Sequence, residues 1–182
     1  MPEKLQGPEN TLQGPENTLQ GPENTRTAAM ALEQATVLIV EDGDEYREHL
    51  GRFVPGPRYL QVHTGAEALA RLAAGGIDLV YLDMRFDRIP RADLLGDHEA
   101  ATAEHGGDPE RGWRYLANNQ GLFFLAALRA AGLDTLPVIL AYDFSRESAR
   151  LAFLQQRHPA LAWVPDAVTP EAIVARMRAL LT

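Results

Sequence analysis

The sequence predicts an α/β fold in which a doubly wound, five-stranded parallel sheet of the (βα)5 type is covered by helices. Short apolar runs alternate with amphipathic segments from Thr36 to the end of the chain. This alternation is typical of βαβ units, whose strands are buried on both faces and therefore read as continuous apolar runs. With 46% hydrophobic residues among 182, the chain can bury one good core. We expect a single domain at residues 35–182, preceded by a tail at residues 1–34.

The tail is a tandem repeat. The segment Leu5–Thr11 is copied twice more, at residues 12–18 and 19–25. Each copy contains Gly-Pro, which breaks a helix, and offers one Leu instead of an apolar pair, so the seven-residue spacing does not predict a coiled coil. We predict that residues 1–34 are disordered, and Met30 is a candidate for the real translation start.

The elements of the domain follow from apolar spacing and from capping residues. The expected strands are 37–40, 59–63, 77–82, 138–141 and 162–164, and the expected helices contain Tyr46–Phe53, Leu69–Leu72, Gly121–Ala131, the segment after Ser145, and Ile173–Leu180. Thr64 and Glu67 form a capping box. Ser145 is a candidate N-cap for the helix that follows it. Thr169-Pro170-Glu171 supplies a cap, a first-turn proline and a first-turn acid for the last helix.

Three carboxylates stand at the ends of two of these strands. Glu41 and Asp42 follow the first apolar run, and Asp83 follows the third. Carboxyl ends of parallel strands gather at one edge of the sheet, which is where open α/β sheets bind ligands. Acids brought together repel one another unless a cation neutralises them, so the pattern predicts a divalent metal with oxygen ligands, for which Mg2+ is the best match.

Composition excludes several classes of function. The net charge of -8 argues against a nucleic-acid backbone or an anionic membrane as the main partner. The absence of cysteine excludes disulfides, thiol catalysis and cysteine-type zinc sites. No apolar run approaches the roughly 20 residues needed to span a bilayer, and the N-terminus lacks the basic and apolar regions of a signal peptide. We therefore expect a cytoplasmic protein that binds a protein partner or a small charged ligand.

Thr36 to Thr182 resembles the receiver domain of two-component response regulators, a flavodoxin-like fold. The matching segments are residues 37–42 with Arg47 and Leu50, residues 64–69, and residues 78–83. The resemblance implies that Glu41, Asp42 and Asp83 bind Mg2+, and that the backbone carbonyl of Arg85 completes the protein's ligands. It also implies that Asp83 is the phospho-acceptor. The partners that it implies are a histidine kinase or a downstream effector in a phosphorelay, and a homodimer through the last helices.

The sequence departs from the family at the residues that contact the phosphoryl group. The alignment puts Tyr142 where the family has a small hydroxyl residue, Trp163 at the aromatic switch position, and Asp166 where the family has a lysine. A shift of the alignment does not restore the lysine, because the only lysine of the chain is Lys4. A phosphoryl group carries roughly two negative charges and would meet Asp166 instead of a cation. We therefore expect weak or absent phosphorylation.

The second departure is an insertion at about residues 86–118, between the third strand and the helix that begins near Gly121, a stretch that the family spans in far fewer residues. It contains Arg88 and Arg91, which are candidate substitutes for the lost lysine because guanidinium groups bind phosphate well. Two forms are open: a lid over the edge of the sheet, or a surface loop or extra helix capped by Asp108 with Pro109. The second is favoured, since insertions in surface loops cost little stability.

Two functional interpretations follow. The favoured one is an atypical, stand-alone receiver that acts in two-component signal transduction through protein–protein interaction, with weak or absent phosphorylation at Asp83. The alternative is a functional phospho-accepting receiver that takes phosphate from a histidine kinase onto Asp83 with Mg2+. We do not expect an enzyme. A phosphatase with Asp83 as nucleophile would need a second aspartate two residues later, where Arg85 stands.

Overall fold

The computed structural model describes residues 30–165 and 167–182. Its centre is the parallel five-stranded sheet that the sequence predicts, with its strands in the order β2-β1-β3-β4-β5. The strands are β1 (Thr36–Val40), β2 (Arg58–Val62), β3 (Leu79–Asp83), β4 (Val138–Ala141) and β5 (Leu161–Val164). The repetitive segment at residues 5–25 and Asp166 lie outside the described residues.

The register of β1 and β3 brings the strand-end acids to one edge. Val40 lies opposite Leu82, so Glu41 leaves β1 at the level of Asp83. β3 begins two residues later than predicted and includes Asp83 as its last residue. The residue before β3 is still paired with β1, because the Asp78 N–H donates to the Thr36 carbonyl at 3.0 Å.

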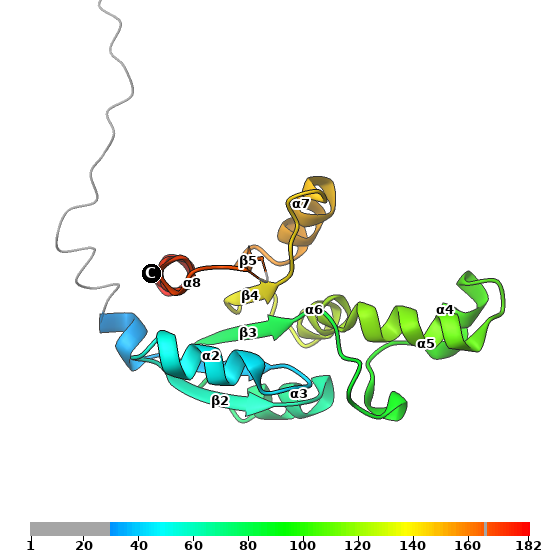
Figure 1. Ribbon diagram of the computed structural model, residues 1–182, viewed down its shortest axis with the longest axis horizontal. Helices are drawn as coiled ribbons and strands as arrows, with labels where there is room; N and C mark the ends of the chain where they lie inside the picture. Colours follow the sequence, from blue (N-terminus) through cyan, green and yellow to red (C-terminus); the bar gives the residue numbers. More distant parts are fainter. Residues whose placement is uncertain (1–29, 166) are drawn as a thin grey trace, which may run out of the picture.

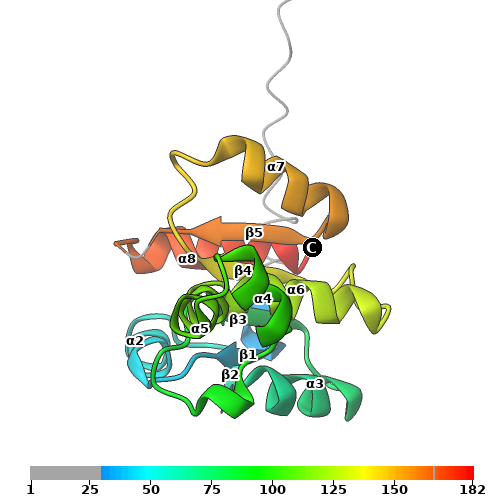
Figure 2. The same ribbon diagram turned by 90° about the vertical axis from the view of Figure 1, so that its right-hand side faces the viewer.

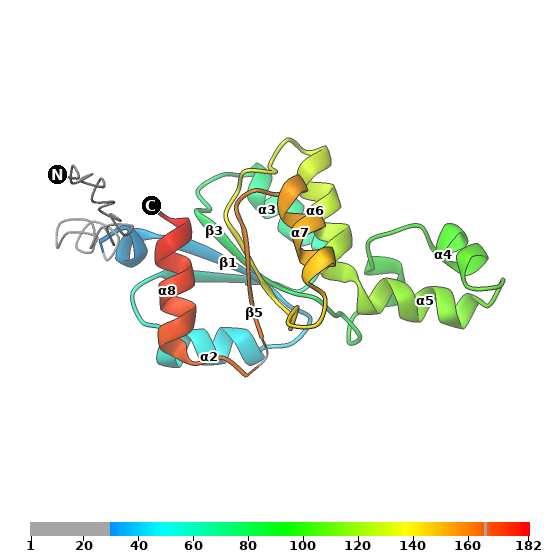
Figure 3. The same ribbon diagram turned by 90° about the horizontal axis from the view of Figure 1, so that it is seen from above.

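Helices cover both faces of the sheet. They are α2 (Glu45–Phe53), α3 (Gly65–Ala73), α6 (Gln120–Ala130), α7 (Ser148–Arg157) and α8 (Pro170–Leu180). Figure 3 shows α3, α6 and α7 on one face and α2 and α8 on the other. Each face has its own buried cluster, exemplified by Phe124 on the first and Met177 on the second. This is the doubly wound arrangement expected from the alternation of strands and helices.

The helix caps follow the sequence in two cases and depart from it in a third. Thr64 and Glu67 form the predicted capping box of α3, and Thr169 caps α8 with Pro170 in the first turn. Ser145 does not cap a helix: α7 begins at Ser148 without a side-chain cap bond. The Ser145 N–H instead donates to the Asp143 carboxylate at 2.9 Å. A local turn therefore competes with the cap, as short polar side chains allow.

The domain begins before residue 35. Residues 30–34, which the sequence assigns to the disordered tail, are helical. Leu32 is only 4% exposed and belongs to the cluster that contains Met177. A helical segment of five residues is too short to show apolar periodicity, which explains the misplaced boundary. Across the described residues, no helix is both long and apolar enough to cross a membrane.

The insertion is ordered. After a short turn, η1 (Arg91–Asp93), it forms two helices, α4 (His98–Glu104) and α5 (Pro109–Asn118). The two pack together as a hairpin that projects from the carboxyl end of the sheet (Figures 1 and 2). Asp108 caps α5 and Pro109 occupies its first turn, as expected for an extra helix. We call residues 86–118 the insertion and α4 with α5 its hairpin.

Backbone and amide contacts fix the base of the insertion. Its first residue, Phe86, donates its N–H to the carbonyl of Ala117, near its last residue, at 2.9 Å. The side chain of Gln120 is 1% exposed; it accepts from the Leu95 N–H at 2.8 Å and donates to the carbonyls of Leu95 and Leu116. A buried amide with all of these bonds made gives a rigid attachment.

Candidate functional site

The three acids predicted from the strand ends, Glu41, Asp42 and Asp83, lie at the carboxyl edge of β1 and β3, and we call them the acid rim. Glu41 is 2% exposed and faces the start of α2. Its carboxylate accepts the N–H groups of Tyr46 and Arg47, each at 2.8 Å, and the Gln61 side chain at 3.2 Å. Glu41 therefore caps α2 from outside the helix, where a negative charge is favourable. Burial raises the pKa of this carboxyl, although the two backbone donors oppose the shift.

Asp42 holds the beginning of the insertion. One of its oxygens, Oδ2, accepts the backbone N–H of Asp87 at 2.5 Å and that of Arg88 at 2.7 Å. The Arg88 guanidinium in turn pairs with Glu45 at 2.6 Å, although both side chains are largely exposed. The insertion thus approaches the acid rim through its first residues rather than through its hairpin.

Asp83 is the third acid of the rim. It ends β3 and is neither fully buried nor exposed. Burial raises its pKa to about 7, with smaller contributions from the charges of Asp42 and Glu41. The backbone N–H groups of Arg85 and Met84 favour the ionised form and reduce the shift. Near neutral pH a substantial part of this carboxyl is therefore protonated and unable to act as a nucleophile.

The acid rim has the right donor chemistry for Mg2+ but the wrong arrangement. Three carboxylates are the oxygen ligands that hard divalent cations prefer. Glu41 and Asp42, however, direct their oxygens at backbone N–H groups. No group of three His, Cys, Asp or Glu side chains in residues 30–165 and 167–182 is arranged to hold a metal ion. As folded here, the rim does not fit the cation that the resemblance implies.

Tyr142, at the position of the family's small hydroxyl, directly follows β4 and is fixed by a chain of polar contacts. Its hydroxyl donates to Glu147 at 2.6 Å, and this bond raises the pKa of the Tyr142 hydroxyl. Glu147 pairs with Arg150 at 2.7 Å, and Arg150 donates to the side chain of Asn119 at 2.9 Å. Because Asn119 lies between α5 and α6, the chain connects the loop after β4 to the base of the insertion.

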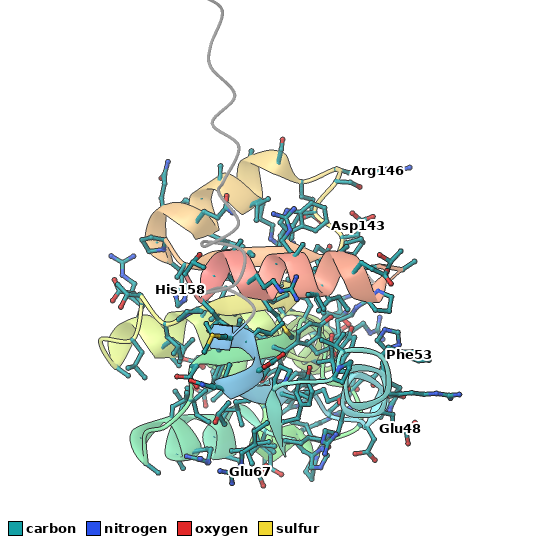
Figure 4. All side chains as sticks on the ribbon, turned by 90° about the vertical axis from the view of Figure 1, so that its left-hand side faces the viewer. Glu48, Phe53, Glu67, Asp143, Arg146 and His158 are labelled. Carbon is teal, nitrogen blue, oxygen red and sulfur yellow. The ribbon has the colours of Figure 1, made fainter. Side chains whose placement is uncertain are left out.

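The remaining residues of this region are those of the loop after β4 and Trp163, at the aromatic position on β5. Asp143 and Arg146 are both exposed there, and Arg146 points into solvent (Figure 4). Trp163 on β5 is half-buried and makes an edge contact with Phe144, with ring centroids 6.1 Å apart. Asp166 is outside the described residues, so its predicted position opposite a phosphoryl group stays a prediction.

The two candidate substitute cations have carboxylate partners. Arg88 pairs with Glu45 beside the acid rim. Arg91 forms two hydrogen bonds of 2.7 Å with Glu110 and lies over the ring of Trp113 at 5.8 Å. Trp113 stacks on His98 with centroids 3.7 Å apart. Arg91 thus joins η1 to α5. Arg88 lies close enough to the acid rim for the charge of Asp42 to contribute to its raised pKa.

Two glutamines of the site are not evident from motif matching. Gln61, on β2, donates to Glu41 and also to the Gly43 carbonyl at 2.7 Å and the Asp44 carboxylate at 3.1 Å, so it braces the loop that carries Asp42. Gln120 anchors the insertion, as described above. For Gln61 the available signal is a polar residue between Leu60 and Val62 in a strand, whereas Gln120 follows Asn118 and Asn119 and carries no such signal.

No protein-family model matches the sequence, and no curated protein does either. Solved structures do match. A receiver domain of a Francisella response regulator is 14% identical, with a TM-score of 0.55 over 81% of this chain and 97% of that one. A chemotaxis response regulator of Vibrio cholerae is 15% identical, with a TM-score of 0.52 over 81% and 98%.

A response regulator receiver domain protein from Clostridium thermocellum is 13% identical, with a TM-score of 0.52 over 81% of this chain and 94% of that one. The three structures are nearly covered from end to end, so the likeness concerns the whole receiver fold and not a fragment of it. At these identities it concerns the fold alone. The chain therefore has the fold of response regulator receiver domains, with a helical hairpin inserted after β3.

Proposed function

We propose that this chain is an atypical receiver in two-component signal transduction that acts by binding a protein partner, with weak or absent phosphorylation at Asp83. The observation that carries the proposal is the fixed Tyr142. A receiver switch needs a small hydroxyl that can move toward a phosphoryl group; here a bulky phenol is tied to Glu147, which is itself held by Arg150. Moving it would break a charge-assisted hydrogen bond.

The charges around Asp83 support the same proposal. The chain has no lysine after residue 4, and Arg88 and Arg91 are paired with Glu45 and Glu110. An incoming phosphoryl group would therefore add negative charge to a rim that already holds three acids. A histidine kinase or a downstream effector remains the class of partner that fits, because binding needs the surface of the fold and not the chemistry of Asp83.

The alternative is a phospho-accepting receiver that uses Asp83 and Mg2+. One feature favours it: Asp83 ends β3 at the carboxyl edge and keeps part of its surface open to solvent. For this alternative to hold, Asp42 would have to release the Asp87 and Arg88 amides, and another cation would have to replace the missing lysine.

Intact-mass spectrometry separates the two. The full chain is incubated with Mg2+ and acetyl phosphate, alongside Asp83→Asn and the double variant Tyr142→Thr with Asp166→Lys. We expect no more than a trace adduct in the wild type and a clear gain in the double variant. A stoichiometric adduct in the wild type that disappears in Asp83→Asn would establish the alternative instead. No gain in the double variant would refute the charge and size argument.

A further inference from the structure

The first residues of the insertion are bound to the acid rim by an unusual pair of donors. A single oxygen, Asp42 Oδ2, accepts the consecutive backbone N–H groups of Asp87 and Arg88. A carboxylate oxygen offers two acceptor sites, so these two bonds use the whole capacity of that atom. Hydrogen bonds to an ionised acceptor are the stronger kind, and they join positions that are 45 and 46 residues apart in the chain.

A full positive charge accompanies the two amides. The Arg88 guanidinium pairs with Glu45 at 2.6 Å. The hydrogen bond with Glu45 is the main cause of the raised pKa of Arg88, and the charges of Asp42 and Asp87 act in the same direction. The same short segment thus brings two partially positive N–H groups to Asp42, while its guanidinium is paired with Glu45 and its Asp87 carboxylate adds a negative charge nearby.

We propose that the two N–H groups of the Asp87–Arg88 segment occupy Asp42 in place of a divalent cation, so docking of this segment on Asp42 Oδ2 through both amides and cation binding at the same oxygen exclude each other. A cation on Oδ2 would displace at least one of the two amides, because both acceptor sites of that oxygen are already in use. The proposal deepens the proposed function and rests on it in treating the acid rim as a degenerate receiver site.

The structure also limits what a displaced segment would do. Phe86 remains tied to Ala117, and Leu95 remains tied to Gln120. Release of Asp42 would therefore loosen only the residues between Phe86 and Arg91, because Arg91 in η1 stays bonded to Glu110 and the base of the hairpin stays in place. The exposed Arg88 would lose its alignment with Glu45 at the same time.

NMR on the full-length wild-type chain tests the proposal directly. MgCl2 is titrated at constant ionic strength, and the shifts and hydrogen exchange of the Asp87 and Arg88 amides are followed. We expect both amides to be protected without Mg2+ and at least one of them to lose protection if Mg2+ binds at Asp42. Binding at Asp42 that leaves both amides protected would overturn the proposal, and so would an Arg88→Pro variant, with one donor removed, that shows no Mg2+-dependent change at residues 42 and 87.

Variants make the test quantitative. Arg88→Pro removes one N–H donor together with the guanidinium, and Arg88→Ala is the matched control that removes the guanidinium alone. The proline variant should bind Mg2+ about tenfold more tightly than the alanine variant, the effect of one hydrogen bond to a charged group. Equal affinities would contradict the substitution. Asp42→Asn should keep the amides protected and abolish their response to Mg2+.

The readout involves no phosphate. If this proposal fails, the acetyl phosphate experiment still has to decide the proposed function. If the wild type is phosphorylated, amide exchange at residues 87 and 88 still decides whether a cation competes for Asp42.

Discussion

At the scale of single residues, Asp83 shows how burial changes the chemistry of a side chain. Its pKa lies at about 7 in the folded protein against an ordinary value of 3.8. The native state therefore binds the proton more tightly than the unfolded chain does. The stability that this adds is complete below the ordinary value and is lost as the pH rises through 7.

We predict that Asp83→Asn, which cannot ionise, stabilises the protein at pH 8 by about 1–3 kcal/mol and has less effect at pH 5. Urea unfolding of both proteins at the two pH values measures this. Asp93→Asn, at an exposed acid of the insertion, is the control and should change stability little at either pH. An Asp83→Asn variant that is equally or less stable than the wild type at pH 8 would mean that the carboxylate has a counterion.

The sequence could place the acids of the rim but not their partners. Glu41, Asp42 and Asp83 follow apolar runs, and parallel strands carry such residues to one edge. Their actual partners are amides of α2 and of the insertion, and the amides that bind Asp42 lie far away in the chain. Backbone donors are present at every position except proline, so no residue pattern distinguishes the few that a carboxylate will use.

At the scale of elements, the insertion depends on one buried amide. We predict that Gln120→Ala destabilises the protein by about 2–3 kcal/mol, because the backbone N–H and carbonyl of Leu95 both lose their side-chain partner. Hydrogen exchange at the Leu95 amide should rise with the loss of stability. Gln156→Ala, at an exposed position of α7, is the matched control and should stay within about 0.5 kcal/mol of the wild type.

The packing of α6 on β3 can be tested by two glycine substitutions. A Cβ at Gly121 would lie 3.0 Å from the Asp83 carbonyl oxygen and 3.1 Å from the Met84 Cα, both backbone atoms, whereas a Cβ at Gly51 on α2 would meet only the flexible end of Arg47. We expect Gly121→Ala to cost about 1–3 kcal/mol and Gly51→Ala to add about 0.5–1 kcal/mol. Thermal unfolding of both variants measures the difference in sign; equal effects would refute the close approach.

Elements with local signals were predicted well, and those that depend on distant contacts were not. Thr64 and Thr169 cap helices as their neighbours in sequence indicate. Ser145 carries the same kind of signal, yet Asp143 bonds its amide first and α7 starts later. The cap of α5 was predictable from Asp108 and Pro109, but Trp113 also contacts both His98 and Arg91, a packing that spacing does not reveal.

At the scale of the whole molecule, the fold follows from the order of apolar runs. The central strands β1, β3 and β4 are buried between two helical layers, and this burial is what their continuous apolar runs report. The order β2-β1-β3-β4-β5 is compatible with right-handed crossovers between parallel strands. Sequence identity of 13–15% to the solved receiver domains is compatible with this, because the pattern of buried positions and not the identity of the residues determines the sheet.

The hydrogen bond between Phe86 and Ala117 has a consequence for how such a protein can change over generations. The polypeptide leaves the domain after β3 and returns to it before α6 at nearly the same point, so the hairpin is a side branch that interrupts no strand and no helix of the parent fold. A branch of this kind can be acquired, enlarged or discarded in a single genetic event while the parent domain goes on folding as before. New recognition can then evolve on the branch without endangering the sheet that bears it.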